Sequence, residues 1–178
     1  VNDYRFPNLE GSLVWVRERM EVTRASADFY DGKTEFKYLM APLGDPVTPA
    51  RAVFDVNYRD VDLNALSAFY KMQGLALAGR ASGHNEMSWP LGRYVERRGS
   101  GNAVFTTTGP LQGAQLAADA ASDARDRYLI EGPFSNHTPL APIPVAGDVT
   151  YTFDPEAMRF DQSHVYTPDT YVAFEGRS

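Results

Sequence analysis

The feature of this sequence that most constrains its fold is a strictly alternating stretch over residues 51–59. Ala52, Phe54, Val56 and Tyr58 alternate there with Val53 and with polar residues. Successive side chains of a β-strand point to opposite faces of a sheet, so this spacing places an aromatic and aliphatic row on one face. The pattern therefore predicts a β-strand over Arg51–Arg59.

One short helix is expected directly after this strand, near residues 62–73. Asp62 is the expected N-cap, apolar residues follow it at helical spacing, and Gly74 is the expected stop. The extended pattern resumes at Leu75–Arg80, where Gly79 and Gly83 indicate a strand that bends or is closely approached. The unit therefore reads as strand, helix and strand.

A hairpin is expected earlier in the chain, pairing Ala25–Phe29 with Thr34–Met40. The Asp31-Gly32 pair between the two segments supplies the positive φ of a tight turn. The turns Gly83-His84-Asn85 and Gly99-Ser100-Gly101 separate further short strands. With one helix among them, these segments predict a mainly β fold of antiparallel strands. The other expected strands lie within residues 12–29, 86–89, 102–107, 149–153, 158–160 and 170–176.

Residues 109–146 have a different character, being rich in Pro and Ala. They are predicted to form an insertion or loop within a single β-rich segment that spans residues 1–178. Within this stretch, Gln115–Arg127 is either a weakly amphipathic helix or part of a long loop with a helical piece. Because the chain starts at Val1 and ends just after a patterned strand, it is expected to be a fragment of a much larger protein.

Composition and motifs favour a non-enzymatic protein without cofactor or metal. The 178 residues carry a net charge of -6 and no cysteine, which argues against nucleic acid as a partner and excludes thiolate chemistry. His84, His137 and His164 are not spaced as metal ligands, and no nucleophile elbow or phosphate-cradling loop is present. The one local basic cluster, Arg93, Arg97 and Arg98, is either a solvated turn or a contact for a phosphate or lipid headgroup.

Several segments resemble one family of very large bacterial envelope proteins. The resemblance is to the translocation and assembly module (TamB) family and its AsmA-like relatives, and it covers most of the chain outside roughly residues 111–146. Its motifs are loose patterns of Gly, apolar and acidic positions. The segments that carry it are Tyr58–Leu63, Gly74–Gly83, Trp89–Arg93, Gly99–Gly101, Gly147–Asp154 and Thr167–Gly176.

The resemblance implies a curved, groove-like sheet that conducts phospholipids across the periplasm, in a protein anchored in the cell envelope. It implies phospholipid acyl chains, neighbouring β-groove segments of the same parent chain and outer-membrane barrel proteins as partners, with a role in outer-membrane assembly. The expected lipid-groove residues are Phe36, Tyr38, Phe54, Val56, Tyr151, Phe153, Val172 and Phe174.

The same alternation of aromatic residues is compatible with two other architectures. One is a self-contained calycin-like barrel that binds a small apolar ligand, as a cyclase or isomerase would; it requires the first and last strands to pair. The other is an adhesion or scaffolding β-sandwich without a ligand. The edges of the sheet distinguish these alternatives, because an open groove leaves its terminal strands unpaired.

Overall fold

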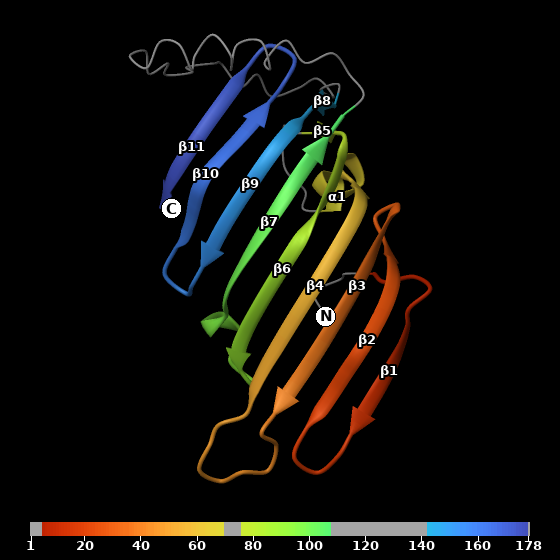
Figure 1. Ribbon diagram of the computed structural model, residues 1–178, viewed down its shortest axis with the longest axis vertical. Coiled ribbons are helices and arrows are strands. Elements are labelled where there is room, and N and C mark those ends of the chain that lie inside the picture. Colours follow the sequence, from red (N-terminus) through yellow and green to blue (C-terminus); the bar gives the residue numbers. More distant parts are fainter. Residues whose placement is uncertain (1–4, 70–75, 108–141, 178) are drawn as a thin grey trace.

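The computed structural model describes residues 5–69, 76–107 and 142–177. Nine strands form one antiparallel sheet in the order β1-β2-β3-β4-β6-β7-β9-β10-β11, and β5 and β8 form a separate parallel pair (Figure 1). The described elements are β1 (Glu10–Trp15), β2 (Met20–Phe29), β3 (Gly32–Ala41), β4 (Arg51–Asp62), α1 (Leu63–Phe69), β5 (Leu77–Ala78), β6 (Arg80–Pro90), the 3-10 helix η1 (Tyr94–Glu96), β7 (Arg98–Thr106), β8 (Ile143–Pro144), β9 (Ala146–Phe153), β10 (Met158–Tyr166) and β11 (Tyr171–Arg177).

The nine-stranded sheet is open, with β1 at one edge and β11 at the other. The mainly β, antiparallel fold is confirmed. A calycin-like barrel requires the first and last strands to pair. Among the described residues β1 and β11 lie at opposite edges of the sheet and do not pair, so this alternative is wrong for them. A closed barrel would also hide every edge, whereas all six residues of β1 are exposed here.

The predicted strand over Arg51–Arg59 forms and runs three residues further, to Asp62. A β-bulge between Tyr58 and Val61 brings both side chains to the same face, with Asp60 at φ 54°. The helix α1 then starts at Leu63. The predicted N-cap is confirmed, since Asp62 Oδ1 accepts the backbone N–H of Ala65 at 2.9 Å. The predicted stop at Gly74 lies outside the described residues.

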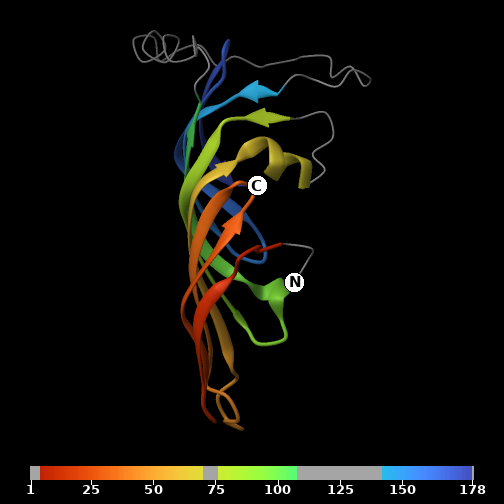
Figure 2. The same cartoon turned by 90° about the vertical axis from the view of Figure 1, so that its right-hand side faces the viewer.

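The sheet is curved, and Figure 2 shows α1, β5 and β8 all on its concave side. Register shifts interrupt five strand pairs: β1 with β2, β2 with β3, β4 with β6, β9 with β10, and β10 with β11. Each bulge inserts an extra residue, bends its strand and increases the local right-handed twist. These irregularities account physically for a sheet that curls around one face.

The β2–β3 hairpin forms as predicted, but its turn lies one residue earlier than expected. Phe29 pairs with Gly32, so Tyr30 and Asp31 are the two turn residues, with φ of 44° and 61°. Gly32 is instead the first residue of β3, where a Cβ would lie 2.5 Å from the Arg59 carbonyl oxygen. Close approach of β4, rather than positive φ, is what requires glycine there.

Most of the predicted insertion over 109–146, including the helix alternative at Gln115–Arg127, lies outside the described residues. The last residues of this segment form strands where a loop was expected. Ile143 and Pro144 form β8 parallel to β5, and β9 begins at Ala146. Backbone hydrogen bonds from Ile143 to Ala76 and from Val145 to Ala78 hold this pair together.

Among the described residues, the hydrophobic core is small and lies at the end of the sheet covered by α1. Its buried cluster consists of Val61, Leu63, Ala81 and Val145. Most other buried apolar residues are alanines on the strands, such as Ala25 and Ala52. The large aromatic side chains therefore lie mostly outside this core.

Candidate functional site

The eight predicted groove residues all lie on one face of the sheet, here called the apolar face. Phe36 pairs with Val56, and Tyr38 pairs with Phe54, between β3 and β4. The registers through β6, β7, β9 and β10 place Tyr151, Phe153, Val172 and Phe174 on the same face. This is the concave face, on which α1 and the buried cluster around Leu63 also lie.

Aromatic rings form a continuous row across the first half of the apolar face. The row runs from the N-terminal segment through β3, β4 and β6 into the β6–β7 loop. Ring centroids along it are 5.2–6.4 Å apart, the range in which aromatic pairs attract one another. We call this set the aromatic row: Phe6, Phe36, Phe54, Tyr38, Trp89 and Tyr94.

Phe6 and Trp89 were missed by sequence reasoning, for different reasons. Trp89 shares one face of β6 with Met87 and Asn85, so a strand assignment longer than 86–89 would have placed it on the apolar face. Phe6 lies in an irregular segment and stacks on Phe29 at 5.5 Å. No local pattern predicts that contact, because it depends on a chain reversal.

The predicted turns at Gly83-His84-Asn85 and Gly99-Ser100-Gly101 are wrong, since both segments lie inside strands. These glycines face aromatic rings instead. A Cβ on Gly83 would lie 2.7 Å from the Tyr58 hydroxyl, and one on Gly101 would lie 2.6 Å from the Tyr151 hydroxyl. The rings of the neighbouring strands lie across the space that side chains would fill.

A few polar groups lie in the middle of the apolar face. Tyr58 donates a hydrogen bond from its hydroxyl to the Asn102 carbonyl at 3.0 Å. Asn85 Oδ1 is buried and has no hydrogen-bond partner among the residues that the structure describes. Burial raises the pKa of both Tyr58 and Tyr151, so their hydroxyls stay protonated at neutral pH. They are therefore suited to hydrogen bonding and not to acting as bases.

The apolar face is only partly covered by the described residues. All eight predicted residues keep partial or full solvent exposure, and Val172 on the edge strand is 38 % exposed. The side chains that are fully buried on this face are small, such as Ala52 and Ala25. The face therefore offers aromatic and aliphatic surface for contact with another apolar molecule.

The opposite face of the sheet is mainly polar, although Tyr166 and Tyr171 also lie on it. His84 Nε2 lies 2.8 Å from Asp55 Oδ1, between β6 and β4, and His164 Nδ1 lies 3.8 Å from Asp148. His137 lies outside the described residues. Within the described ranges, no three side chains of His, Cys, Asp or Glu gather as metal ligands. These histidine contacts bridge neighbouring strands on the solvent side.

A separate hollow of about 520 Å³ lies beside the β2–β3 turn, lined by charged and aromatic residues. Lys33 and Asn8 hydrogen-bond to the Asp28 carboxylate and hold its pKa below its usual range. Because Arg5, Asp28, Asp31 and Lys33 line the hollow, it is a less suitable site for an apolar ligand than the apolar face.

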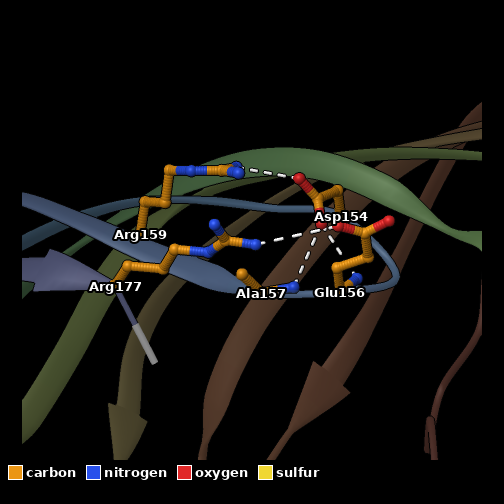
Figure 3. Close-up of polar contacts among 5 residues, drawn as sticks. All are labelled: Asp154, Glu156, Ala157, Arg159 and Arg177. Atoms are coloured by element: carbon orange, nitrogen blue, oxygen red, sulfur yellow. Dashed lines mark hydrogen bonds and ion pairs between the residues drawn. The ribbon is translucent and has the colours of Figure 1, made fainter.

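The β9–β10 turn is held by one carboxylate, as Figure 3 shows. Asp154 Oδ1 accepts the backbone N–H groups of Glu156 and Ala157, and Oδ2 accepts a bond from Arg159 at 2.8 Å. Arg159, with help from the Glu156 N–H, lowers the pKa of Asp154 to about 2. Arg177 of β11 reaches Glu156 at 3.7 Å, which links the edge strand to the turn.

Replacing Asp154 with asparagine is expected to make stability less dependent on acid pH. The pKa is about 2 in the folded chain against a reference value of 3.8, so the carboxylate stabilises the fold above pH 3.8. This contribution disappears as the pH falls towards 2. The difference in Tm between the wild type and Asp154→Asn should therefore be largest at neutral pH and vanish near pH 2.

Thermal unfolding followed by circular dichroism measures this difference. Glu175→Gln, an exposed carboxylate on β11, is the control and should give a small difference at every pH. A Tm difference for Asp154→Asn that stays constant down to pH 2 would contradict the assigned role.

The fold and this site define a β protein built on one large open sheet, with an aromatic concave face and a mainly polar convex face. Comparisons with family models, with curated proteins and with solved structures give no match for this chain. Within the described ranges, no helix has the length and apolar character needed to cross a bilayer.

Proposed function

We propose that this chain is a non-enzymatic segment of an envelope-spanning β-groove protein, similar to the TamB and AsmA-like proteins. Its role in this proposal is to hold phospholipid acyl chains during transport and to contribute to outer-membrane assembly. The observation that carries the proposal is the open sheet whose aromatic concave face is only partly covered by the described residues.

Passive contact is sufficient for this role. Each methylene group of an acyl chain that leaves water for an apolar surface contributes about 0.8 kcal/mol. The apolar face supplies ring faces and aliphatic side chains for that contact, with few polar groups to disrupt it. No bond needs to form or break.

The two exposed edges support the proposed partners. Trp15 at the β1 edge is 72 % exposed, and Val172 lies on the β11 edge. Unpaired edge strands bind further strands through backbone hydrogen bonds, so neighbouring β-groove segments of the same parent chain fit there. The proposal also includes outer-membrane barrel proteins as partners, and a periplasmic location as part of a protein anchored in the cell envelope.

The sandwich alternative receives less support. A sandwich needs a second sheet packed over the apolar face at about 10 Å. In the described part of the chain, the second sheet consists of β5 and β8, with two residues each. That pair covers one end of the apolar face, next to α1.

Carboxylates placed on the apolar face are expected to abolish phospholipid retention. The purified chain, expressed together with a membrane fraction, should carry phospholipid in native mass spectrometry. Phe54→Asp and Phe153→Asp should lower the retained fraction about tenfold or more, because an acyl chain cannot solvate a carboxylate. Val104→Asp, at a position on the polar face that is 50 % exposed, is the matched control and should retain lipid.

Circular dichroism separates lost binding from lost folding. Val172→Asp adds a variant at an exposed edge position, which tolerates the charge even where Phe54→Asp does not fold. A wild type that stays free of lipid, with Phe54→Asp and Phe153→Asp unfolded, would identify these aromatics as a closed core and overturn the proposal.

A further inference from the structure

The aromatic row ends at a cation. Trp89 contacts Tyr94 edge-on, with the ring centroids 5.2 Å apart, and the guanidinium of Arg97 lies 4.9 Å above the Tyr94 ring. The row therefore leads from apolar side chains in the middle of the sheet to a positive charge in the β6–β7 loop. Figure 2 shows this loop on the concave side of the sheet, the same side as α1.

The β6–β7 loop is built so that this charge is accessible. A turn closed by the Arg93 N–H and the Pro90 carbonyl begins the loop, with Gly92 at φ 82°. The 3-10 helix η1 follows and ends with the bond from the Arg97 N–H to the Tyr94 carbonyl. The loop carries apolar side chains that are strongly exposed, with Tyr94 at 44 % and Val95 at 75 %.

The arginines of this loop differ in their partners. Arg93 forms an ion pair with Glu96 at 3.0 Å. Arg97 contacts the Tyr94 ring and, among the described residues, has no carboxylate partner. Arg98 is the first residue of β7 and pairs with Ser88, so its side chain belongs to the polar face. One arginine is therefore left at the end of the aromatic row.

We propose that Arg97 binds the phosphate of a phospholipid whose acyl chain lies along the aromatic row. This inference rests on the proposed function and specifies its ligand as a lipid with a phosphodiester headgroup. A guanidinium pairs well with phosphate oxygens, and stacking on Tyr94 leaves its N–H groups free to donate. The order of apolar row and cation matches the order of chain and headgroup in such a lipid.

The charge of the rest of the chain strengthens this assignment. The net charge is -6, so the chain as a whole repels an anionic headgroup, and an exposed arginine that has no carboxylate partner among the described residues, as Arg97 does, offers local attraction. An exposed aromatic ring beside an arginine also fits the boundary between acyl chains and headgroups, where amphipathic side chains are favoured. The β6–β7 loop is thus the headgroup end of the proposed lipid site.

The test compares two lipids with identical acyl chains, phosphatidylglycerol and diacylglycerol. Each is offered to the purified chain as a minor component of neutral vesicles, and lipid retained per chain is counted by native mass spectrometry. The wild type should favour phosphatidylglycerol. Arg97→Gln should lower this preference about tenfold, while Arg98→Gln, with the same charge change on the opposite face, should leave it unchanged.

The possible results separate the headgroup inference from the proposed function. Equal retention of both lipids by the wild type and Arg97→Gln would overturn the headgroup site and leave the lipid-binding face intact. Retention of neither lipid would overturn both. Binding of inorganic phosphate that depends on Arg97, without retention of either lipid, would identify a site for soluble phosphate and reject the lipid. Circular dichroism confirms that each variant is folded.

Discussion

Replacing Leu63 with alanine should lower the free energy of unfolding by about 2–5 kcal/mol, as is typical when a buried leucine is truncated. Leu63 is the first residue of α1 and is 4 % exposed, in contact with the small core of Val61, Ala81 and Val145. A cavity there cannot easily collapse, because the bulge at Val61 and the backbone bond from Leu63 to Gly79 hold the surrounding chain. The loss is a large fraction of the 5–15 kcal/mol that usually stabilises a domain.

Urea unfolding of the purified chain measures this loss. Leu9→Ala is the matched control, because Leu9 is 56 % exposed and its truncation should change stability by no more than about 0.5 kcal/mol. A cost below about 1 kcal/mol for Leu63→Ala would mean that α1 does not anchor this end of the sheet.

Replacing Gly101 with alanine should destabilise the sheet by about 1–3 kcal/mol, the usual cost of overpacking. The added Cβ would lie 2.6 Å from the Tyr151 hydroxyl and 2.9 Å from the His84 carbonyl oxygen. The Tyr151 ring must therefore move away from the strand it covers. This change also disturbs the middle of the proposed lipid-binding face.

A double-mutant cycle tests whether the ring is the cause. In a Tyr151→Ala background, Gly101→Ala should cost less than half of its value in the wild type, because the nearest obstacle has gone. Ser100→Ala, at an exposed position next along the strand, controls for the substitution of a residue in β7. Equal costs in the two backgrounds would show that the backbone contact with His84, and not the ring, excludes a side chain.

These variants probe two different parts of one sheet. Leu63 reports on the end that α1 covers, where small and aliphatic side chains make a conventional core. Gly101 reports on the open part, where aromatic rings lie over glycines and remain accessible. The two variants therefore test the packing of the covered end and of the open part separately.

Local patterns predicted much of the secondary structure, and the reason is visible in particular residues. The alternation around Phe54 places one row on one face wherever the strand pairs, and Asp62 caps a helix through contacts within three residues. Both effects act over short distances. The same pattern also placed Phe36, Tyr151 and Phe174 correctly on a common face.

Glycine positions were misread because their reason lies in other strands. Gly83 and Gly101 have the local character of turn residues, yet each accommodates a ring from a neighbouring strand. The local pattern likewise predicts the hairpin turn at Asp31 and Gly32, one residue later than the observed turn at Tyr30 and Asp31. Gly32 is glycine because β4 approaches it closely, and not because of the turn. Contacts between strands far apart in the chain leave no periodic signal.

By itself, the sequence determined the β class, the helix start at Asp62 and the placement of most strand aromatic residues on one face of the sheet. Only the tertiary structure decided that the sheet stays open, that its apolar face is concave and that Trp89, Tyr94 and Arg97 continue the aromatic row. The physical reason is that alternation is a property of each strand alone. Closure and curvature depend on how nine strands pair and where their bulges fall.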